Sequence, residues 1–330
     1  MAGIGPVLLC GCGSIGKRHL LNLAALGATV TAICDPNLSA IPDGPWSKSR
    51  SVEELAESAK DALTVIASPT KEHVPHARLL LEAGARAVLV EKPLGVNHTE
   101  AKQLKPWAKR IAVAFNYRFL GPLYDSLDRC MQDNGQKLVI ISATDDISKW
   151  PSFGPGSYML DPAQGGVLLT SGSHSIDLLI SMLGYPEWLV AGLAGLADSP
   201  QEHSSLMGID SGALLRMGFP DYNTGIVDAS WMPAMSEHSL VMAVTAHGAI
   251  IVDLMRYDFD RAKQLMHLNM MEHFLSWAND GPASHLCLFP DALAGMLVID
   301  AAWRSNEIGG QVIMRDGEIV QVDNGENAGA

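Results

Sequence analysis

The stretch Val7-Leu-Leu-Cys-Gly-Cys-Gly-Ser-Ile-Gly16 decides the fold of the first part of this chain. A short apolar run leads into the pattern G-x-G-x-x-G, in which each glycine has its own physical reason. Gly11 permits a tight turn from strand to helix, Gly13 leaves room for a pyrophosphate beside the backbone, and Gly16 lets the helix pack closely on the strand. The pattern is typical of a dinucleotide-binding turn, with an ordinary glycine turn as the alternative.

The residues after the glycines continue the same unit. A helical pattern over Ser14–Leu26 ends at Gly27, which is suited to a left-handed C-cap, and a second apolar run, Val30–Cys34, ends at Asp35. Phosphates are expected on the unpaired N–H groups of the first helical turn, at Ser14 and Ile15. Asp35 ends the second strand, where a carboxylate accepts hydrogen bonds from a ribose diol. The whole stretch therefore predicts a β-α-β unit that binds a dinucleotide.

Length and charge narrow the class of protein. A chain of 330 residues exceeds the size at which one core usually stops growing, so two domains are expected. The chain carries 23 basic and 36 acidic residues, a net charge of -13, which disfavours binding to nucleic acid or to an anionic membrane. No apolar run reaches the length of a membrane span, and the first residues lack the pattern of a signal peptide.

Five cysteines occur, at positions 10, 12, 34, 130 and 287. Three of them lie in or beside the first predicted strands, where a buried thiol is the usual interpretation, so a reducing, cytoplasmic setting is expected. No metal is expected. No Cys or His pair follows Cys10 and Cys12 at zinc spacing.

Strands and helices alternate through the first third of the chain. The predicted strands are Val7–Cys10, Val30–Cys34, Ala62–Ala67, Ala87–Val90 and Ile111–Phe115. The predicted helices cover Ser14–Leu26, a short segment opening at Ser51, Glu72–Glu82, and a segment that begins with the capping box Asn97-His-Thr-Glu100 and kinks or ends near Pro106. Nearly apolar strands alternating with helices indicate an α/β domain with a parallel sheet covered on both faces.

Beyond Tyr117 the pattern changes, so we place the domain boundary between residues 1–117 and 118–330. A helix is predicted over Leu120–Gln132, then a strand over Leu138–Thr144. The runs Gly212–Phe219, Gly225–Ser230, Ser239–Ala246 and Ala249–Leu254 are typical of an antiparallel meander, and a helix over Asp291–Arg304 precedes a strand over Gly310–Met314. Methionines in or near these runs favour core or subunit-interface packing over a flexible binding surface; they are Met242, Met255, Met266, Met270 and Met271.

Polar residues that directly follow predicted strands are the candidates for binding and chemistry, because ligands bind at the carboxyl ends of strands in α/β sheets. One group is Glu91-Lys92-Pro93, in which Lys92 is expected to hold and polarise a substrate hydroxyl; a solvated loop lysine is the alternative. A second group is Ser68, Pro69 and Thr70, expected to line the nicotinamide of a cofactor. His73, next in that segment, is left open between a structural role at a helix start and a role in the pocket.

A third group lies between Gly165 and Asp177. Thr170, His174 and Asp177 fall at positions i, i+4 and i+7, so a helix would place them on one face. His174 is the best candidate base, because the unperturbed pKa of histidine lies near neutrality and a hydroxyl proton must leave as a hydride departs. Asp177 either orients the imidazole or, as we favour, anchors the helix.

Five segments together resemble one family. They are Gly11-Cys-Gly-Ser-Ile-Gly-Lys-Arg-His19, Ser68-Pro-Thr-Lys-Glu-His73, Glu91-Lys-Pro-Leu94, Asn116-Tyr-Arg-Phe119 and the stretch from Gly165 to Asp177. In this order and spacing they are similar to the glucose-fructose oxidoreductase / inositol dehydrogenase / rhizopine-catabolism (Gfo/Idh/MocA) family. The resemblance covers essentially the whole chain, and Glu91-Lys92-Pro93 is its most specific motif.

The resemblance implies an α/β fold with an N-terminal Rossmann domain and a C-terminal α+β domain. The latter is expected to carry a large, mainly antiparallel open sheet that forms a homodimer or homotetramer interface. It also implies a nicotinamide cofactor, substrates that are sugars, sugar nucleotides or cyclitols, Lys92 as the active-site lysine and His174 as the catalytic histidine. One departure stands out, since many members carry an aspartate where this chain has Thr170. A threonine can hydrogen-bond a substrate hydroxyl but supplies no negative charge, so His174 acts alone or Asp177, Asp145 or Asp146 compensates.

These observations together predict an NAD-dependent oxidoreductase that interconverts a secondary alcohol and a ketone on a sugar, sugar derivative or cyclitol. Asp35 favours NAD over NADP, because a carboxylate repels a 2′-phosphate, although Lys17, Arg18 and Asn37 soften that preference. Cofactor contacts are also expected from His73, Glu91 and Lys92. Substrate contacts are expected from Lys92, Tyr117, Arg118, Asp161, Thr170 and His174, with a domain-joining role as the alternative for Tyr117 and Arg118. The alternative functions are an NADP-dependent ketosugar-nucleotide reductase and a non-catalytic dinucleotide-binding regulatory protein.

Overall fold

The computed structural model describes residues 5–121, 132, 135–150, 157–161, 163–195, 209–231, 237–254 and 259–323. The chain divides into two compact units. The first comprises Met1–Gly95, Thr99–Phe119 and Lys263–Ala292, and the second comprises Val96–His98, Leu120–Ala262 and Leu293–Ala330. The first unit therefore contains a segment, Lys263–Ala292, that lies far along the chain. The predicted division into domains of residues 1–117 and 118–330 stays a proposal.

A seven-stranded sheet forms the first unit, in the order β13-β6-β5-β4-β1-β2-β3. Its strands are β1 (Val7–Cys10), β2 (Val30–Cys34), β3 (Ser47–Ser49), β4 (Leu63–Ile66), β5 (Ala87–Val90), β6 (Ile111–Val113) and β13 (Cys287–Leu288). All neighbours pair in parallel except β13, which is antiparallel to β6. Every residue of β1, β4 and β5 is buried, as expected for a parallel sheet covered on both faces. The direction of strand addition reverses between β1 and β4, and ligands bind at such a switch point in α/β sheets.

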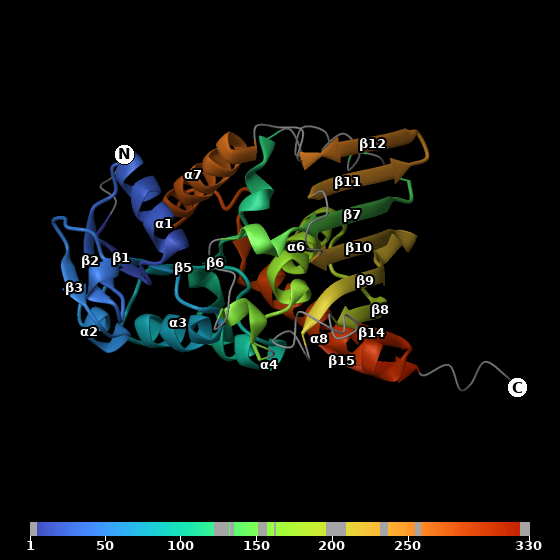
Figure 1. The fold of residues 1–330 in the computed structure, drawn as a ribbon, viewed down its shortest axis with the longest axis horizontal. Coiled ribbons are helices and arrows are strands. Elements are labelled where there is room, and N and C mark those ends of the chain that lie inside the picture. The colour runs from blue at the N-terminus through green and yellow to red at the C-terminus, as the bar shows by residue number, and fades with distance from the viewer. Residues whose placement is uncertain are drawn as a thin grey trace, which may run out of the picture. The chain divides into compact units, whose positions relative to one another are not determined.

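Helices cover both faces of this sheet. Figure 1 shows α1 (Ser14–Ala25) and α7 (Phe259–Trp277) on one face, and α2 (Val52–Ala56) and α3 (His73–Glu82) on the other. Local signals set their ends: Gly27 follows α1 with φ +72°, and the Ser51 side chain accepts a hydrogen bond from the N–H of Glu54 at the start of α2. The segment that begins with the predicted capping box forms α4 (His98–Ala101) and the 3-10 helix η3 (Lys102–Arg110), whose geometry breaks at Trp107, next to Pro106.

An eight-stranded sheet forms the second unit, in the order β12-β11-β7-β10-β9-β8-β14-β15 (Figure 1). Its strands are β7 (Leu138–Asp145), β8 (Trp188–Gly195), β9 (Asp210–Gly218), β10 (Thr224–Trp231), β11 (His238–Thr245), β12 (Gly248–Asp253), β14 (Gln311–Arg315) and β15 (Glu318–Asp323). Only β7 and β10 pair in parallel; the other neighbours are antiparallel. The predicted fold class, a Rossmann unit and a mainly antiparallel sheet domain, is confirmed.

One face of the second sheet is packed and the other is open. On β9, Leu215 is buried while its neighbours Leu214 and Arg216 are exposed, which is the alternation of a half-covered sheet. The covered face lies against α6 (Ser173–Leu183) and the part of α8 (Phe289–Ile308) that belongs to this unit. The fully buried hydroxyl of Ser305 on α8 accepts the N–H of Ala191 at 2.9 Å.

Two sequence predictions need correction. The predicted meander is wrong, because β7 lies between β10 and β11 and so separates two consecutive strands. Sequence periodicity cannot reveal such an insertion, since the pairing of β7 depends on contacts far along the chain. The methionines at 266, 270 and 271 lie on α7 rather than near strands, although all three are buried core residues, as expected. The predicted helix over 120–132 falls mostly outside the described residues, as do Met255 and Cys130.

Two further expectations concern membranes and thiols. No helix in the described part of the chain is both long and apolar enough to cross a bilayer. Four described cysteines, Cys10, Cys12, Cys34 and Cys287, are buried free thiols.

Candidate functional site

The glycine loop between β1 and α1 has little space for any side chain at two of its three glycines. Gly11 has φ +92°, and a Cβ added there would lie 2.5 Å from the carbonyl oxygen of Ala67. A Cβ on Gly16 would lie 2.1 Å from the carbonyl oxygen of Gly11. A Cβ on Gly13 would meet no atom within 4 Å. The loop thus needs Gly11 and Gly16 for its own packing, whereas Gly13 leaves open space on its outer side.

The start of α1 faces that open space. Gly13 occupies the N-cap position without a side-chain hydrogen bond, and no acidic residue lies in the first turn. Ser14 is exposed and Ile15 half-buried. The first N–H groups of a helix carry a partial positive charge and lack intrahelical partners, so this end suits a phosphate.

Asp35 is tied to the same loop. One carboxylate oxygen accepts the N–H of Cys12 at 2.8 Å, and the other accepts the N–H of Asn37 at 2.9 Å. These bonds hold a half-buried carboxylate at the end of β2, beside the glycine loop. A carboxylate has about four lone-pair positions, so it retains acceptor capacity for a ribose diol. The open side of Gly13, the uncapped helix and this carboxylate together fit a dinucleotide such as NAD.

The segment after β4 is fastened to the segment after β5 by His73. Its ring nitrogens lie 2.7 Å from the carbonyl oxygen of Pro93 and 2.9 Å from that of Ser68. Burial lowers the pKa of His73, and the two carbonyl contacts work against that shift. The structure thus gives His73 a bracing contact with both loops. Its predicted contact with the cofactor stays a proposal, as do those of Ser68, Pro69 and Thr70.

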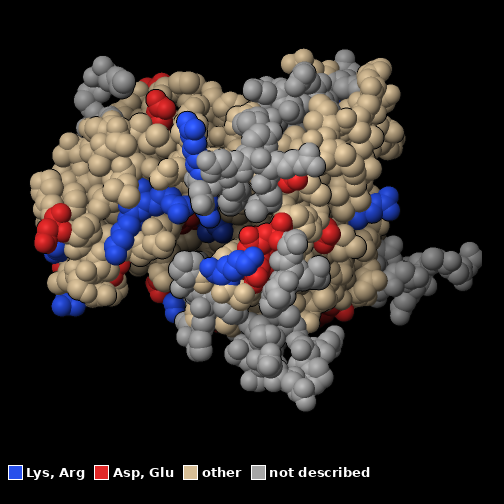
Figure 2. Space-filling view, turned by 45° about the horizontal axis from the view of Figure 1, so that its top comes forward, with Lys and Arg blue, Asp and Glu red and all other residues tan. Residues whose placement is uncertain are grey.

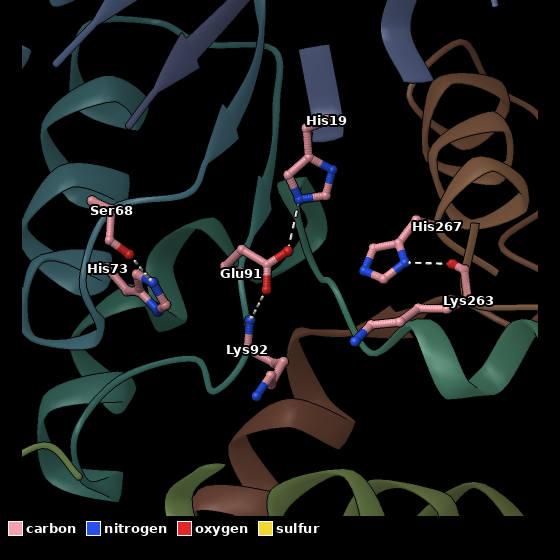
Figure 3. Close-up of polar contacts among 7 residues, drawn as sticks. All are labelled: His19, Ser68, His73, Glu91, Lys92, Lys263 and His267. Atoms are coloured by element: carbon pink, nitrogen blue, oxygen red, sulfur yellow. Dashed lines mark hydrogen bonds and ion pairs between the residues drawn. The ribbon is translucent and has the colours of Figure 1, made fainter. Parts of the chain in front are cut away.

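Glu91 directly follows β5 and faces inward. One carboxylate oxygen lies 2.7 Å from Nε2 of His19 on α1, and the other accepts the backbone N–H of Lys92 at 3.2 Å (Figure 3). Burial raises the pKa of Glu91, but the hydrogen bond and charge of His19 outweigh it, so that the net shift is downward. Glu91 is therefore a buried carboxylate braced by α1.

Sequence reasoning missed two neighbours of this pair, because they lie on α7. His267 is buried, and its ring stands edge-on to that of His19 with centroids 6.4 Å apart. Its Nδ1 contacts the carbonyl oxygen of Lys263 at 2.7 Å, and burial lowers its pKa to about 4, so the ring is neutral at physiological pH. In Figure 3 the Lys263 side chain extends toward the same region as Glu91 and Lys92. These residues are distant in sequence from Glu91, and they become its neighbours because the segment Lys263–Ala292 folds into the first unit.

The third predicted group lies on a π turn followed by α6. The π turn, η7 (Leu168–Gly172), begins two residues after Gly166, where φ is +95° and an added Cβ would lie 2.2 Å from a carboxylate oxygen of Asp210. That carboxylate accepts the N–H of Leu168 at 2.7 Å, and burial raises its pKa. Single π turns within helices are frequent at functional sites. Asp210 and Gly166 thus build the turn that precedes His174.

Within this turn Thr170 is buried, and its hydroxyl donates to the carbonyl oxygen of Gly166 at 2.7 Å. His174, on the first turn of α6, is half-buried between buried neighbours, and Asp177 is buried. The hydroxyl of Ser171 donates to Asp145 at 2.5 Å and accepts the indole N–H of Trp231 at 3.2 Å. Sequence reasoning missed Ser171. Of the aspartates considered as compensation for Thr170, Asp145 therefore contacts the turn that contains Thr170.

The remaining predicted residues have contacts of their own. Arg118, in the 3-10 segment η4 (Asn116–Phe119) that includes Tyr117, is buried and donates to the carbonyl oxygen of Leu286 and to Asp291, at 3.2 and 3.1 Å. These bonds favour an anchoring role for Arg118. Asp161 accepts from the N–H of Ala163 and the amide of Gln164. Asp146 accepts from the N–H of Ser148 and pairs with Lys149, so its carboxylate serves a local turn.

Comparison with known proteins bears on the first unit most directly. Residues 6–119 match the model of the GFO_IDH_MocA family, described as an oxidoreductase family with an NAD-binding Rossmann fold. The matched range includes the glycine loop, Asp35, Glu91 and Lys92. The resemblance inferred from sequence motifs is confirmed over these residues. A comparison with curated proteins found no match.

Solved structures share the fold over nearly the whole chain. GenD2 from gentamicin A biosynthesis, in complex with NAD, matches with a TM-score of 0.81 at 20% identity, covering 96% of this chain and 97% of that one. Levoglucosan dehydrogenase in complex with NADH matches with a TM-score of 0.81 at 18% identity, covering 94% and 99%. A myo-inositol dehydrogenase from Corynebacterium glutamicum matches with a TM-score of 0.76 at 18% identity, covering 94% and 98%. At these identities the likeness shows the fold.

Proposed function

Because residues 6–119 carry the NAD-binding Rossmann domain of the Gfo/Idh/MocA oxidoreductase family, we propose that this chain is an NAD-dependent dehydrogenase of sugar-like alcohols. Its reaction interconverts a secondary alcohol and a ketone on a sugar, sugar derivative or cyclitol. The observation that carries the proposal is Lys92, which follows β5 in the same parallel sheet that holds the glycine loop and Asp35. The solved relatives include enzymes named for levoglucosan and myo-inositol, which supports a polyhydroxylated substrate.

The residues divide the work of the reaction. The backbone around Gly13 and the first turn of α1 hold the pyrophosphate, and Asp35 accepts the ribose hydroxyls. Bound NAD+ would supply the hydride acceptor, and bound NADH would supply the donor in the reverse direction. Lys92 donates a hydrogen bond to the substrate oxygen and stabilises negative charge on it. A ring nitrogen of His174 takes the hydroxyl proton, or returns it in the reverse direction.

Thr170 supplies no charge to that histidine. Its hydroxyl is engaged with the carbonyl oxygen of Gly166, which supports a role in shaping the π turn that precedes His174. Thr170 stands where many family members carry an aspartate, so in our proposal another carboxylate supplies the negative charge near His174. Asp145 reaches the turn through Ser171 and is the candidate that compensates.

Turnover of a polyol panel tests the function. Wild-type protein is mixed with NAD and with cyclitols, aldoses, anhydrosugars and sugar nucleotides, and NADH formation is followed by absorbance. Lys92→Met and His174→Gln are each expected to lower kcat by about 10²- to 10⁴-fold, the usual range for a general acid–base group. The matched controls are Lys105→Met and His247→Gln, at exposed positions outside the proposed site, and they are expected to keep wild-type rates. Wild-type turnover in Lys92→Met would refute the assignment.

We also propose that the open face of the second sheet joins copies of this chain. The strand register places one residue from each of six strands in a row across this face: Val190, Arg216, Ile226, Ile140, Met242 and Ile251. Five of the six are apolar, and Val190 and Ile251 are 42% and 66% exposed. A row of apolar side chains exposed to water favours association with a like surface.

Charge supports the absence of a nucleic-acid partner. The net charge is -13, and on the face drawn in Figure 2 acidic side chains lie among the basic ones of the described residues. A chain with this net negative charge is repelled overall by a phosphate backbone. The four buried free thiols support a reducing, cytoplasmic location.

A further inference from the structure

We propose that His19 is a positioning residue for Lys92, acting through the buried carboxylate of Glu91. His19 lies on α1, one turn beyond Gly16, and reaches the end of β5 across the first unit. The inference deepens the proposed function, because it concerns how that site holds its lysine. It is carried by the contacts of three residues, His19, Glu91 and Lys92 (Figure 3).

The first step is that the His19 ring serves Glu91. The side chain of His19 has no exposed surface, and its Nε2 lies 2.7 Å from Oε1 of Glu91. Within the part of the chain that the structure describes, Nδ1 of His19 is buried and has no hydrogen-bond partner. A buried polar atom without a partner is unfavourable. The contact between Nε2 and Glu91 therefore offsets the cost of burying Nδ1 without a partner.

The second step is that Glu91 passes this restraint to Lys92. Its second oxygen, Oε2, accepts the backbone N–H of Lys92 at 3.2 Å. The next residue is held as well, because the carbonyl oxygen of Pro93 contacts Nδ1 of His73 at 2.7 Å. Lys92 thus sits between two fastened points of the backbone. Figure 3 shows its side chain directed away from the Glu91 carboxylate, so a shift at this point would move the ammonium group.

The third step concerns why a polar pair, His19 and Glu91, occupies a buried position. A buried ion pair is weak evidence for stability, because two apolar residues of similar volume often serve equally well. An apolar pair would fill the space but would not accept the N–H of Lys92. The hydrogen bond from the backbone N–H of Lys92 to Glu91 therefore explains the polar pair better than packing alone does.

The surrounding charges agree with this role. The titratable groups that face Glu91 are His19, His267 and Lys92. Burial holds the pKa of His267 at about 4, so this neighbour is neutral and the edge of its ring closes one side of the His19 ring. Glu91 thus keeps its charge for His19 and for the Lys92 backbone.

The test separates positioning from folding with a double variant. His19→Leu combined with Glu91→Met replaces the polar pair by an apolar pair, so the fold and the free energy of unfolding are expected to stay near wild type. We expect kcat to fall roughly 100-fold, the loss typical of a small misplacement of a catalytic group, with KM changed much less. His19→Gln, which keeps an N–H donor for Glu91, is the conservative rescue and is expected to restore most of kcat. Should the double variant fail to fold, the single His19→Met is compared with His19→Gln in the same way.

A second readout does not depend on turnover. The rate at which an amine-reactive reagent modifies Lys92 is measured by mass spectrometry on the full chain, with Lys105 as the exposed internal reference. The double variant is expected to change the Lys92 rate several-fold and His19→Gln to leave it unchanged. If the wild type turns over no alcohol, the proposed function fails while this rate still decides the positioning role. A folded double variant with wild-type kcat and an unchanged Lys92 rate would overturn the inference.

Discussion

Replacing Asp300 by asparagine is expected to stabilise the protein at neutral pH and to have little effect in acid. Asp300 lies on α8, where one carboxylate oxygen accepts the N–H of His98 at 3.2 Å. The other oxygen is buried and has no hydrogen-bond partner among the described residues. Burial raises the pKa of Asp300 from 3.8 to about 6, and the bond from His98 offsets only part of that rise. The charged form of this side chain is thus disfavoured by the fold.

The sign of the effect follows from proton binding. Between pH 3.8 and about 6 the folded protein holds a proton on Asp300 that the unfolded chain has lost, so stability falls as pH rises through this window. A shift of about two pKa units corresponds to about 3 kcal/mol. Because the side chain is partly exposed, solvent screening reduces this to about 1–2 kcal/mol. Above that window the penalty is fully present.

Asparagine removes the charge and keeps an oxygen for the N–H of His98. In urea denaturation followed by circular dichroism, Asp300→Asn is expected to raise the free energy of unfolding by about 1–2 kcal/mol at pH 7.5. At pH 4 the gain is expected to vanish, because the wild-type carboxyl is then protonated in the folded state. The matched control is Asp316→Asn in the exposed turn after β14, where φ is +53° and asparagine fits equally well. An equal gain at both pH values, or a loss at pH 7.5, would refute the reasoning.

Three further predictions concern the cofactor and the sheet surface. Gly16→Ala is expected to lower both stability and NAD affinity, because its Cβ would lie 2.1 Å from the carbonyl oxygen of Gly11. Gly13→Ala is expected to keep its stability and to lower only NAD affinity, because a Cβ there meets no atom within 4 Å. Thermal denaturation and fluorescence titration with NAD measure the two effects, and a stable Gly16→Ala would contradict the packing argument. Asp35→Ser is expected to shift the ratio of kcat/KM for NAD over NADP toward NADP by at least about 10-fold, since the carboxylate repels a 2′-phosphate; a wild-type preference for NADP would sink the role of Asp35. Leu214→Glu, on the open face where Leu214 is 57% exposed, is expected to yield monomers in size-exclusion chromatography with light scattering. An unchanged mass would argue against an interface on this face.

Local chemistry explains why so much of the first unit was predictable. The strands β1, β2, β4, β5 and β6 of its sheet are short, mostly apolar runs separated by helical patterns. Such signals act over a few residues and survive in any tertiary context. Gly11 and Gly16 were expected to be needed for a tight turn and for close packing, and the structure places backbone oxygens within 2.5 Å of their missing side chains. The end of β2 at Asp35 was predicted for the same reason.

Long-range pairing explains what sequence patterns missed. Nothing near Leu138 indicates that β7 inserts between β10 and β11, because that order depends on contacts between residues 86 to 106 positions apart. Helix α7 carries polar residues around its buried side, so its sequence does not show that His267 and three methionines face the core. These residues are buried only in the folded chain. The π turn before His174 was also missed, since its geometry depends on Asp210 from another strand. These features arise only when distant segments meet.

The sequence by itself determined the dinucleotide loop, the carboxylate at Asp35 and the presence of Lys92 at a strand end, because turn geometry and hydrophobic periodicity are local properties. It also named His19 within a motif but assigned it no role. The tertiary structure decided that role, since only folding removes His19 and Glu91 from water and brings them within 2.7 Å. A histidine on a helix and a glutamate after a strand are ordinary polar residues in an extended chain. Burial makes their contact strong, and thereby ties the helix that begins the cofactor site to the backbone of Lys92.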